Sequence, residues 1–122
     1  MAHRILTVDD SVSIRKMVRF SLEKEGHSVS EAEDGEKALA LLQKEDADML
    51  ITDLDMPEMD GFDLVRNVRA IPKYRRMPIV ILTTESNDEF KRKARAAGAT
   101  AWITKPFKPN QIVGVLSRLL PG

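Results

Sequence analysis

Short apolar runs alternate along this chain with longer segments of helical periodicity, and this alternation limits the fold more than any other feature of the sequence. The runs occupy residues 5–8, 28–32, 49–53, 79–83 and 101–104. Three of them are strongly apolar, which suits central strands covered on both faces, whereas 28–32 is more polar and is expected nearer an edge. The alternation predicts an α/β fold, a doubly wound (βα)5 domain with a five-stranded parallel sheet and right-handed crossovers.

The segments between the runs carry apolar residues at helical spacing, as amphipathic helices do. The first helix is expected to include residues 14–22 and to stop at Gly26. The others are expected at about residues 36–44, 62–70, 88–97 and 110–120. The fourth has only a narrow apolar stripe, made by Phe90, Ala94 and Ala97, so we expect it to be the helix that moves most easily.

Size and composition exclude several functions. The 122 residues suit one domain, expected to span residues 1–122 without a second. The 19 basic and 19 acidic side chains cancel, so the chain lacks the basic field that supports nucleic-acid binding. It has no cysteine, which excludes disulfides and zinc–thiolate sites and agrees with a reducing cytoplasm. No run approaches the roughly 20 apolar residues that span a bilayer, so no membrane attachment is expected.

Polar residues with complementary chemistry stand at or just after the ends of four runs. They are Asp9, Asp10, Asp53, Thr83 and Lys105. Because ligands bind beyond the carboxyl ends of parallel strands, these side chains are expected to meet at one edge of the sheet. Three carboxylates repel one another unless a cation neutralises them, and a set of oxygen ligands without histidine or cysteine favours Mg²⁺ over zinc. The pattern predicts a magnesium site held by Asp10 and Asp53, with Asp9 binding through a metal-bound water.

The same residues supply the parts of a phosphoryl-transfer site. A carboxylate can serve as the nucleophile, and positive charge and hydrogen-bond donors must face the phosphoryl oxygens. We expect Asp53 to attack phosphorus, Mg²⁺ to neutralise one oxygen, and Thr83 and Lys105 to contact the others.

Four motifs, in this order, resemble those of the receiver domains of response regulators, and the resemblance covers essentially the whole chain. The motifs are Val8-Asp9-Asp10-Ser11, Asp53-Leu54-Asp55-Met56-Pro57-Glu58-Met59-Asp60-Gly61, Thr83-Thr84-Glu85 and Lys105-Pro106-Phe107. The resemblance implies a single receiver domain without an output domain, a flavodoxin-like fold with strand order 2-1-3-4-5, and a phosphorylation-activated switch of a two-component phosphorelay.

The resemblance also implies roles for individual residues. Asp53 is the expected phosphoacceptor, the backbone carbonyl of Asp55 is an expected Mg²⁺ ligand, and the peptide bond from Lys105 to Pro106 is expected to be cis. Thr83 and Trp102 match the family's switch pair, in which the aromatic ring turns from solvent toward the core.

Partners follow from the same resemblance. A histidine kinase or phosphotransfer domain is the expected phosphodonor, and a downstream protein is expected on the face formed by the fourth helix, fifth strand and fifth helix, with chemotaxis or motility as candidate pathways. The chain is expected to be a cytoplasmic monomer whose only chemistry is Mg²⁺-dependent self-phosphorylation and autodephosphorylation. Asp55 stands where the chemotaxis protein of this family carries an amide, and together with Glu85 it leaves the dephosphorylation rate open.

Some of these residues have simpler structural interpretations. Asp9, Asp10 or Ser11 alone could cap the first helix, and Trp102 could be a surface aromatic without a switching role. The basic run at residues 91–95 could be a solvated helix face. The basic residues of the first helix, Arg15, Lys16 and Arg19, form a candidate docking face for a phosphorylated kinase domain.

Two other functions compete with the receiver interpretation. Asp53-Leu54-Asp55 also resembles the paired aspartates of haloacid dehalogenase-type phosphatases, although Pro57 and Gly61 follow where a helix and a cap insertion would be expected. A flavodoxin-type carrier would need a phosphate-cradling loop after the first strand, where Asp9 and Asp10 would repel the phosphate. Turnover of a small phosphate ester would indicate the first, and a coloured preparation the second.

Overall fold

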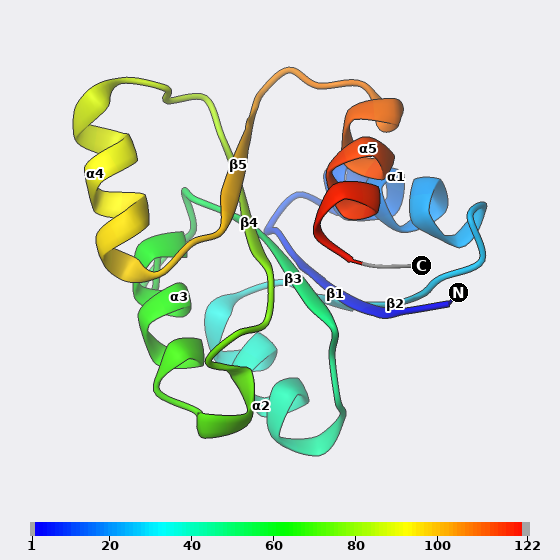
Figure 1. Cartoon of the computed structure of the whole chain (residues 1–122), viewed down its shortest axis with the longest axis horizontal. Coiled ribbons are helices and arrows are strands. Elements are labelled where there is room, and N and C mark those ends of the chain that lie inside the picture. Colours follow the sequence, from blue (N-terminus) through cyan, green and yellow to red (C-terminus); the bar gives the residue numbers. More distant parts are fainter. Residues whose placement is uncertain (1, 121–122) are drawn as a thin grey trace.

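The computed structural model describes residues 2–120, which form a parallel five-stranded sheet covered by helices on both faces (Figure 1). Within these residues the elements are β1 (Arg4–Val8), α1 (Val12–Glu23), β2 (Ser28–Ala32), α2 (Gly35–Lys44), β3 (Met49–Asp53), α3 (Gly61–Arg69), the 3-10 helix η1 (Pro72–Tyr74), β4 (Ile79–Thr83), α4 (Asp88–Ala97), β5 (Ala101–Thr104) and α5 (Pro109–Leu119). The strand order is β2-β1-β3-β4-β5, and every neighbouring pair is parallel. The predicted doubly wound α/β fold and its strand order are confirmed.

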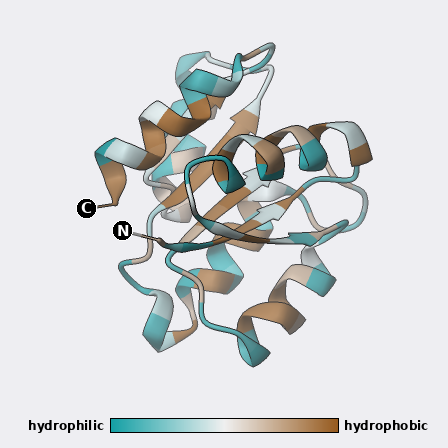
Figure 2. Ribbon diagram, turned by 90° about the vertical axis from the view of Figure 1, so that its right-hand side faces the viewer, coloured by the Kyte–Doolittle hydropathy of each residue, from teal (hydrophilic) through white to brown (hydrophobic). Residues whose placement is uncertain are grey.

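The sheet separates two hydrophobic cores. Helices α1 and α5 cover one face, and α2, α3 and α4 cover the other (Figure 1). Because successive side chains of a strand point to opposite faces, Ile79 and Ile81 of β4 enter the core under α3 and α4, while Val80 and Leu82 enter the core under α1 and α5. The central strands and the inner sides of the helices are accordingly mostly hydrophobic in Figure 2, and the connecting loops are mostly hydrophilic. Both faces of β3 and β4 are buried, as their continuous apolar sequences predict.

Capping residues account for the small differences between predicted and observed helix ends. Asp34 and Asp60 cap α2 and α3 by accepting hydrogen bonds from the backbone N–H groups of Lys37 and Asp63, and both helices therefore begin one residue earlier than expected. Helix α1 ends at Glu23, and Gly26 lies in the following turn with a φ of 90°, a left-handed conformation that glycine adopts without strain. The short helix η1 was not predicted.

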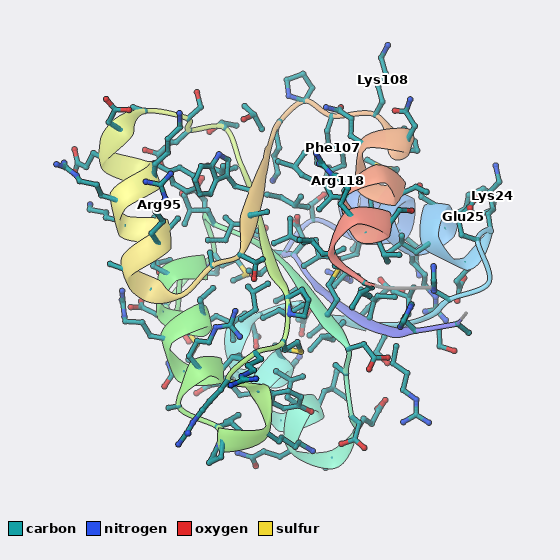
Figure 3. The ribbon with its side chains drawn as sticks, in the orientation of Figure 1. Lys24, Glu25, Arg95, Phe107, Lys108 and Arg118 are labelled. Atoms are coloured by element: carbon teal, nitrogen blue, oxygen red, sulfur yellow. The ribbon has the colours of Figure 1, made fainter. Side chains whose placement is uncertain are left out.

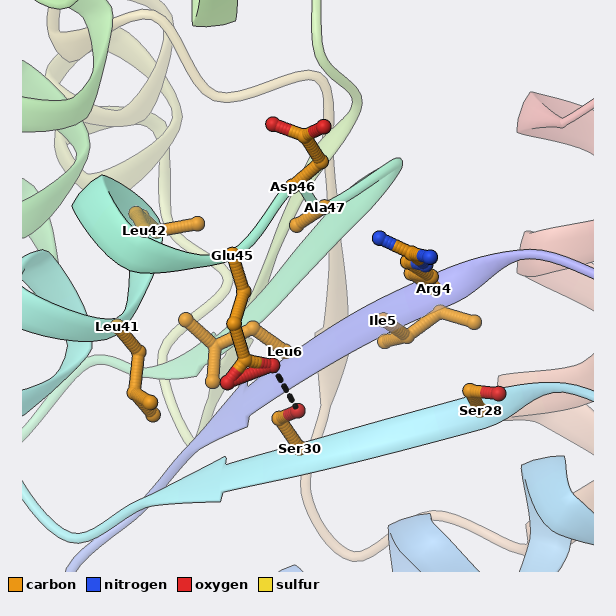
Figure 4. Close-up of a pocket in the computed structure, with 10 residues that line it drawn as sticks. All are labelled: Arg4, Ile5, Leu6, Ser28, Ser30, Leu41, Leu42, Glu45, Asp46 and Ala47. Carbon is orange, nitrogen blue, oxygen red and sulfur yellow. Dashed lines mark hydrogen bonds between the residues drawn. The ribbon is translucent and has the colours of Figure 1, made fainter.

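A pocket of about 120 Å³ lies between α2, the edge strand β2 and its neighbour β1 (Figure 4). Serines replace large side chains on this face of β2, and the Ser30 hydroxyl donates to Glu45 Oε1 at 3.3 Å across the opening. Apolar walls come from Leu6, Leu41 and Leu42. No acid predicted to bind metal lines this pocket. Within residues 2–120, no helix has the length and hydrophobicity that crossing a membrane requires.

Candidate functional site

Three carboxylates converge where β1 and β3 end. Asp9 and Asp10 follow β1, and Asp53 is the last residue of β3, so the parallel pairing of these two strands brings the three residues to one edge of the sheet. One carboxylate oxygen from each lies within 4.8 Å of the other two. Asp9 and Asp53 are buried and Asp10 is exposed. The cluster therefore has a buried floor and one side that solvent can reach.

Asp9 is the most enclosed acid of the cluster, with 1% of its surface exposed. Its Oδ1 accepts a hydrogen bond from the backbone N–H of Ser11 at 2.9 Å, but its buried Oδ2 has no hydrogen-bond partner among the described residues. Burial raises the pKa of Asp9 from 3.8 to about 6; the Ser11 N–H opposes this shift, and the negative charge of Asp53 adds to it. A buried carboxylate oxygen left without a donor, beside two further acids, is an arrangement that a bound cation would stabilise.

Lys105 places its ammonium group inside this cluster. It follows β5, and its Nζ donates to Asp53 Oδ1 at 2.8 Å and lies 3.8 Å from Asp9 Oδ2. The backbone N–H of Lys105 donates to the Thr83 carbonyl at 2.7 Å, and the peptide bond to Pro106 is cis. The side chain is 22% exposed, so its charge is partly desolvated and acts on the two aspartates at close range.

The loop after Asp53 is held close to the sheet by Gly61. A Cβ atom at this position would lie 2.7 Å from the Asp53 carbonyl oxygen and 2.9 Å from Leu54 Cα, so only glycine fits without moving backbone. The Gly61 N–H donates to the Leu54 carbonyl at 2.8 Å, which closes the loop. Asp55, whose carbonyl is the expected metal ligand, lies within this loop and is exposed.

Thr83 ends β4 at the same edge and is buried. Its Oγ1 accepts a hydrogen bond from the backbone N–H of Glu85 at 2.9 Å, which leaves the hydroxyl proton available to a new acceptor. Trp102 pairs in register with Ile81, two residues before Thr83, so Thr83 and Trp102 belong to the same face of the sheet.

The indole of Trp102 is partly buried. Its ring meets the Phe90 ring edge to face, with 5.5 Å between centroids and 84° between planes. The guanidinium of Arg95, labelled on α4 in Figure 3, lies 5.9 Å from the indole centroid. Both neighbours belong to α4, so this helix and the indole are packed together.

The basic residues of α1 are engaged more than the sequence suggested. The Arg15 side chain is only 13% exposed, and Arg15 and Arg19 both donate to the carboxylate of Glu31 on β2, at 3.1 and 2.9 Å. Only Lys16, 3.7 Å from the same carboxylate, keeps a largely exposed side chain. The expectation of an exposed basic face therefore fails for Arg15. The contribution of Glu31 was missed because its partners lie on a different element and no spacing in the sequence connects them.

The donor set fits a magnesium ion. All three acids offer oxygen, and no histidine or cysteine joins the cluster within residues 2–120. Mg²⁺ prefers such ligands, commonly keeps several waters and uses one or two carboxylates together with phosphate oxygens. The unpartnered Asp9 Oδ2 provides a buried acceptor for a metal-bound water, and the exposed Asp10 leaves the opposite side open.

Comparison with known proteins agrees with the fold and the site. The sequence profile of the response regulator receiver domain matches residues 5–117. A chemotaxis protein CheY homolog of Campylobacter jejuni is 44% identical over 119 residues, covering 96% of this chain and 92% of the relative. The structure of the chemotaxis protein CheY4 of Vibrio cholerae superposes with a TM-score of 0.95 at 44% identity, covering 98% of this chain and 100% of that one.

A further structural relative bears on the metal. The receiver domain of a sensor histidine kinase from Pseudomonas aeruginosa, whose structure has a magnesium ion coordinated in its active-site cleft, is 27% identical with a TM-score of 0.88, covering 98% of each chain. The haloacid dehalogenase-type phosphatase and the flavodoxin-type carrier find no support in these matches.

Proposed function

The chain belongs to the response regulator receiver family and is a phosphorylation-activated switch of a two-component pathway, and we propose that Asp53 is the residue that accepts the phosphoryl group. The contact between Lys105 Nζ and Asp53 Oδ1 at 2.8 Å carries this proposal. This contact places the Lys105 ammonium group on Asp53, the acid that ends the central strand β3 between the two hydrophobic cores. This carboxylate also belongs to the three-acid cluster that could hold a metal ion.

The transfer step uses the carboxylate of Asp53 as the nucleophile. One of its oxygens bonds to phosphorus as the bond from phosphorus to the donor's imidazole nitrogen breaks, and the electron pair leaves with the imidazole, which takes up a proton. Lys105 then moves its hydrogen bond from the carboxylate to a phosphoryl oxygen. The Thr83 hydroxyl, whose proton has no acceptor among the described residues, donates to another.

Receiver domains of this family bind Mg²⁺, and we propose Asp10, Asp53 and the Asp55 backbone carbonyl as its ligands, with Asp9 accepting from a metal-bound water. The ion supplies charge neutralisation for the phosphoryl oxygens. Asp9 and Asp10 otherwise repel an incoming phosphate, because both carboxylates lie within 4.8 Å of the Asp53 carboxylate that it must reach.

Incubation with acetyl phosphate and Mg²⁺, followed by intact mass measurement and peptide mapping, tests the proposal. We expect one phosphoryl group, located on Asp53, and none after chelation of the metal. Asp53→Asn is nearly isosteric and should remain folded but unmodified. Modification at another residue of the cluster in the wild-type chain would contradict the choice of Asp53.

We further propose that the signal is read on the face formed by α4, β5 and α5. Receivers of the CheY type interact with kinases and downstream targets, and two relatives of this chain are chemotaxis proteins, so chemotaxis is the proposed pathway. The packing of Trp102 against Phe90 and Arg95 supports the choice of face. Both residues belong to α4, so a shift of the indole changes the contacts that hold this helix. Phosphorylation-dependent changes in amide chemical shifts should gather on these three elements, and changes confined to α2 and α3 would count against this face.

A further inference from the structure

We propose that Arg15 is a positioning residue for the metal site, acting on Asp9 through its backbone carbonyl. Arg15 Nη1 donates to the Asp9 carbonyl oxygen at 2.6 Å. Arg15 lies on the first turns of α1 and Asp9 directly follows β1, the strand that leads into this helix, so the contact closes the connection between them. The inference rests on the proposed magnesium site and names a residue outside its ligand set.

The Asp9 carbonyl needs this donor because the sheet ends beside it. The Asp9 N–H donates to the Ala32 carbonyl at 3.2 Å, as the parallel pairing of β1 with β2 requires. In a continuing ladder the Asp9 carbonyl would then accept from residue 34. Strand β2 ends at Ala32, however, and Asp34 instead caps α2. The guanidinium of Arg15 takes the place of the missing strand donor.

With Arg15 in place, Asp9 is held at each of its polar atoms but one. Its N–H is bound by Ala32, its carbonyl by Arg15 and its Oδ1 by the N–H of Ser11. The remaining atom is Oδ2, which is buried, lacks a hydrogen-bond partner within residues 2–120 and belongs to the three-carboxylate cluster. The orientation of that oxygen therefore depends on contacts that hold the backbone of Asp9, and Arg15 supplies one of the three.

Glu31 fixes the guanidinium in turn. Its Oε1 accepts from Arg15 Nε at 3.1 Å, and its Oε2 accepts from Arg19 Nη1 at 2.9 Å. The hydrogen bond from Arg19, followed by that from Arg15, lowers the pKa of Glu31 despite its partial burial, so the carboxylate is charged over the working range of pH. The planar fork of Arg15 thus bridges a carboxylate on β2 and the carbonyl that follows β1 through two different nitrogens held in a fixed geometry, which the single nitrogen of an ammonium group does not offer.

Electrostatics and positioning predict opposite results when Arg15 is removed. If Arg15 acted only through its charge, deleting a cation near three carboxylates would strengthen the binding of Mg²⁺. If Arg15 positions Asp9, its loss weakens binding, because partners behind a metal ligand hold it in the geometry that the ion requires. Arg19 provides the matched control, since within residues 2–120 it shares Glu31 with Arg15 but its hydrogen bonds go to Glu23 and Glu31 and not to Asp9.

Titration calorimetry of the full chain with magnesium chloride tests the inference. Arg15→Ala should weaken Mg²⁺ binding by about tenfold, at the low end of the loss that follows removal of such a partner. Arg19→Ala should bind Mg²⁺ no more weakly than wild type. A change in global stability does not alter the dissociation constant of molecules that stay folded, so circular dichroism at the titration temperature accompanies each variant. Equal or tighter binding by Arg15→Ala would overturn the inference.

Arg15→Lys decides the question if Arg15→Ala does not fold. It keeps the charge and the aliphatic stem but loses the fork, so it should bind Mg²⁺ more weakly than wild type, and wild-type affinity in this variant would refute positioning. The proposed function and this inference fail differently. If the wild-type chain binds no Mg²⁺, both the proposed function and the inference are refuted. If the wild-type chain binds Mg²⁺ and is phosphorylated on Asp53, but the Arg15 variants bind Mg²⁺ equally well, only the inference is refuted.

Discussion

A single buried carboxylate sets how this protein should respond to pH when no metal is bound. The pKa of Asp9 rises from 3.8 to about 6 on folding, mainly because burial disfavours its charge. The folded chain therefore holds this proton at pH values where the unfolded chain has lost it, and the free energy of unfolding falls as the pH rises between these two values. Urea unfolding in the presence of a chelator should show that the free energy of unfolding falls by up to about 3 kcal/mol across this range.

The Asp9→Asn variant tests that response at one atom. Replacing the charged oxygen by an amide removes the burial cost, so the variant should be more stable than wild type at pH 7 without metal by about 1–3 kcal/mol. It should also lose most of the fall in stability between pH 3.8 and about 6. Saturating Mg²⁺ should raise the stability of wild type at pH 7, since binding to the folded state stabilises it, and should do so less for the variant. An unchanged slope in Asp9→Asn would show that another group titrates.

Two glycines offer a matched test of the loop that carries Asp55. A Cβ at Gly61 would lie 2.7 Å from the Asp53 carbonyl oxygen, whereas a Cβ at Gly114, within α5, would meet nothing within 4 Å. Gly61→Ala must displace backbone beside Asp53, the proposed phosphoacceptor, and should lower the free energy of unfolding by about 1–3 kcal/mol. Gly114→Ala should raise it by about 0.5–1 kcal/mol, because alanine is the better helix former. Thermal and urea unfolding of both variants give the comparison, and a harmless Gly61→Ala would mean that the loop adapts.

Among the elements, α4 is attached to the core more thinly than its neighbour α3. It buries Phe90, Ala94 and Ala97, so two of its three buried side chains are single methyl groups, whereas α3 buries Leu64, Val65 and Val68. Local opening requires little apolar area to be exposed where little is buried. Backbone amides of α4 should therefore exchange with deuterium faster than those of α3.

Phe90→Ala sharpens this prediction, because it removes the main anchor of α4 together with the edge-to-face contact to Trp102. Amide exchange should accelerate further in α4 while the amides of β3 keep their protection until global unfolding. Uniform acceleration throughout the chain would show instead that α4 opens only with the whole domain.

The elements were predictable from the sequence because each one carries its own local signal. Strand runs buried on both faces are continuous in Ile, Leu and Val, and α4 was placed at its observed limits by its apolar spacing. The structure adds that Gly98 ends this helix with a φ of 107°. The convergence of Asp9, Asp53 and Lys105 also followed, since parallel strands end at one edge.

Contacts between elements were not predictable in the same way. The bridge from Glu31 through Arg15 to the Asp9 carbonyl joins β2, α1 and β1, and no spacing within one segment marks it. The partial burial of Trp102 depends on where α4 lies, which the sequence of β5 alone does not determine. Such features need the assembled tertiary structure, because long side chains reach partners that are close in space and distant in sequence.

At the scale of the whole molecule, the site lies where the two cores meet. The sheet separates the core under α1 and α5 from the core under α2, α3 and α4, and Asp53 stands at the end of the central strand between them. Thr83 ends the adjacent strand, and Trp102 lies on the next strand, diagonally behind Thr83 on the same face. A change at Asp53 can therefore reach α4 across two strands.

A phosphoryl group on Asp53 should draw the Thr83 hydroxyl toward it, because that hydroxyl accepts from Glu85 but has a proton to donate. The shift changes the space beside Trp102 and the contact of its indole with Phe90 and Arg95. A ligand moves such an equilibrium only by its differential affinity for the two states, so the bond from Thr83 must form mainly in the active state.

Trp102 is the chain's single tryptophan, so its emission reports this movement without interference. Beryllofluoride with Mg²⁺, which mimics a bound phosphoryl group, should shift the emission and reduce quenching by iodide. Thr83→Ala should weaken both effects while leaving beryllofluoride bound, and Asp53→Asn should abolish them. The effects start from an indole that is already partly buried, so a redistribution between two packed states is expected rather than a transfer from water. Constant emission and quenching with Asp53 demonstrably occupied would refute the coupling between Thr83 and Trp102 and leave the phosphoacceptor unaffected.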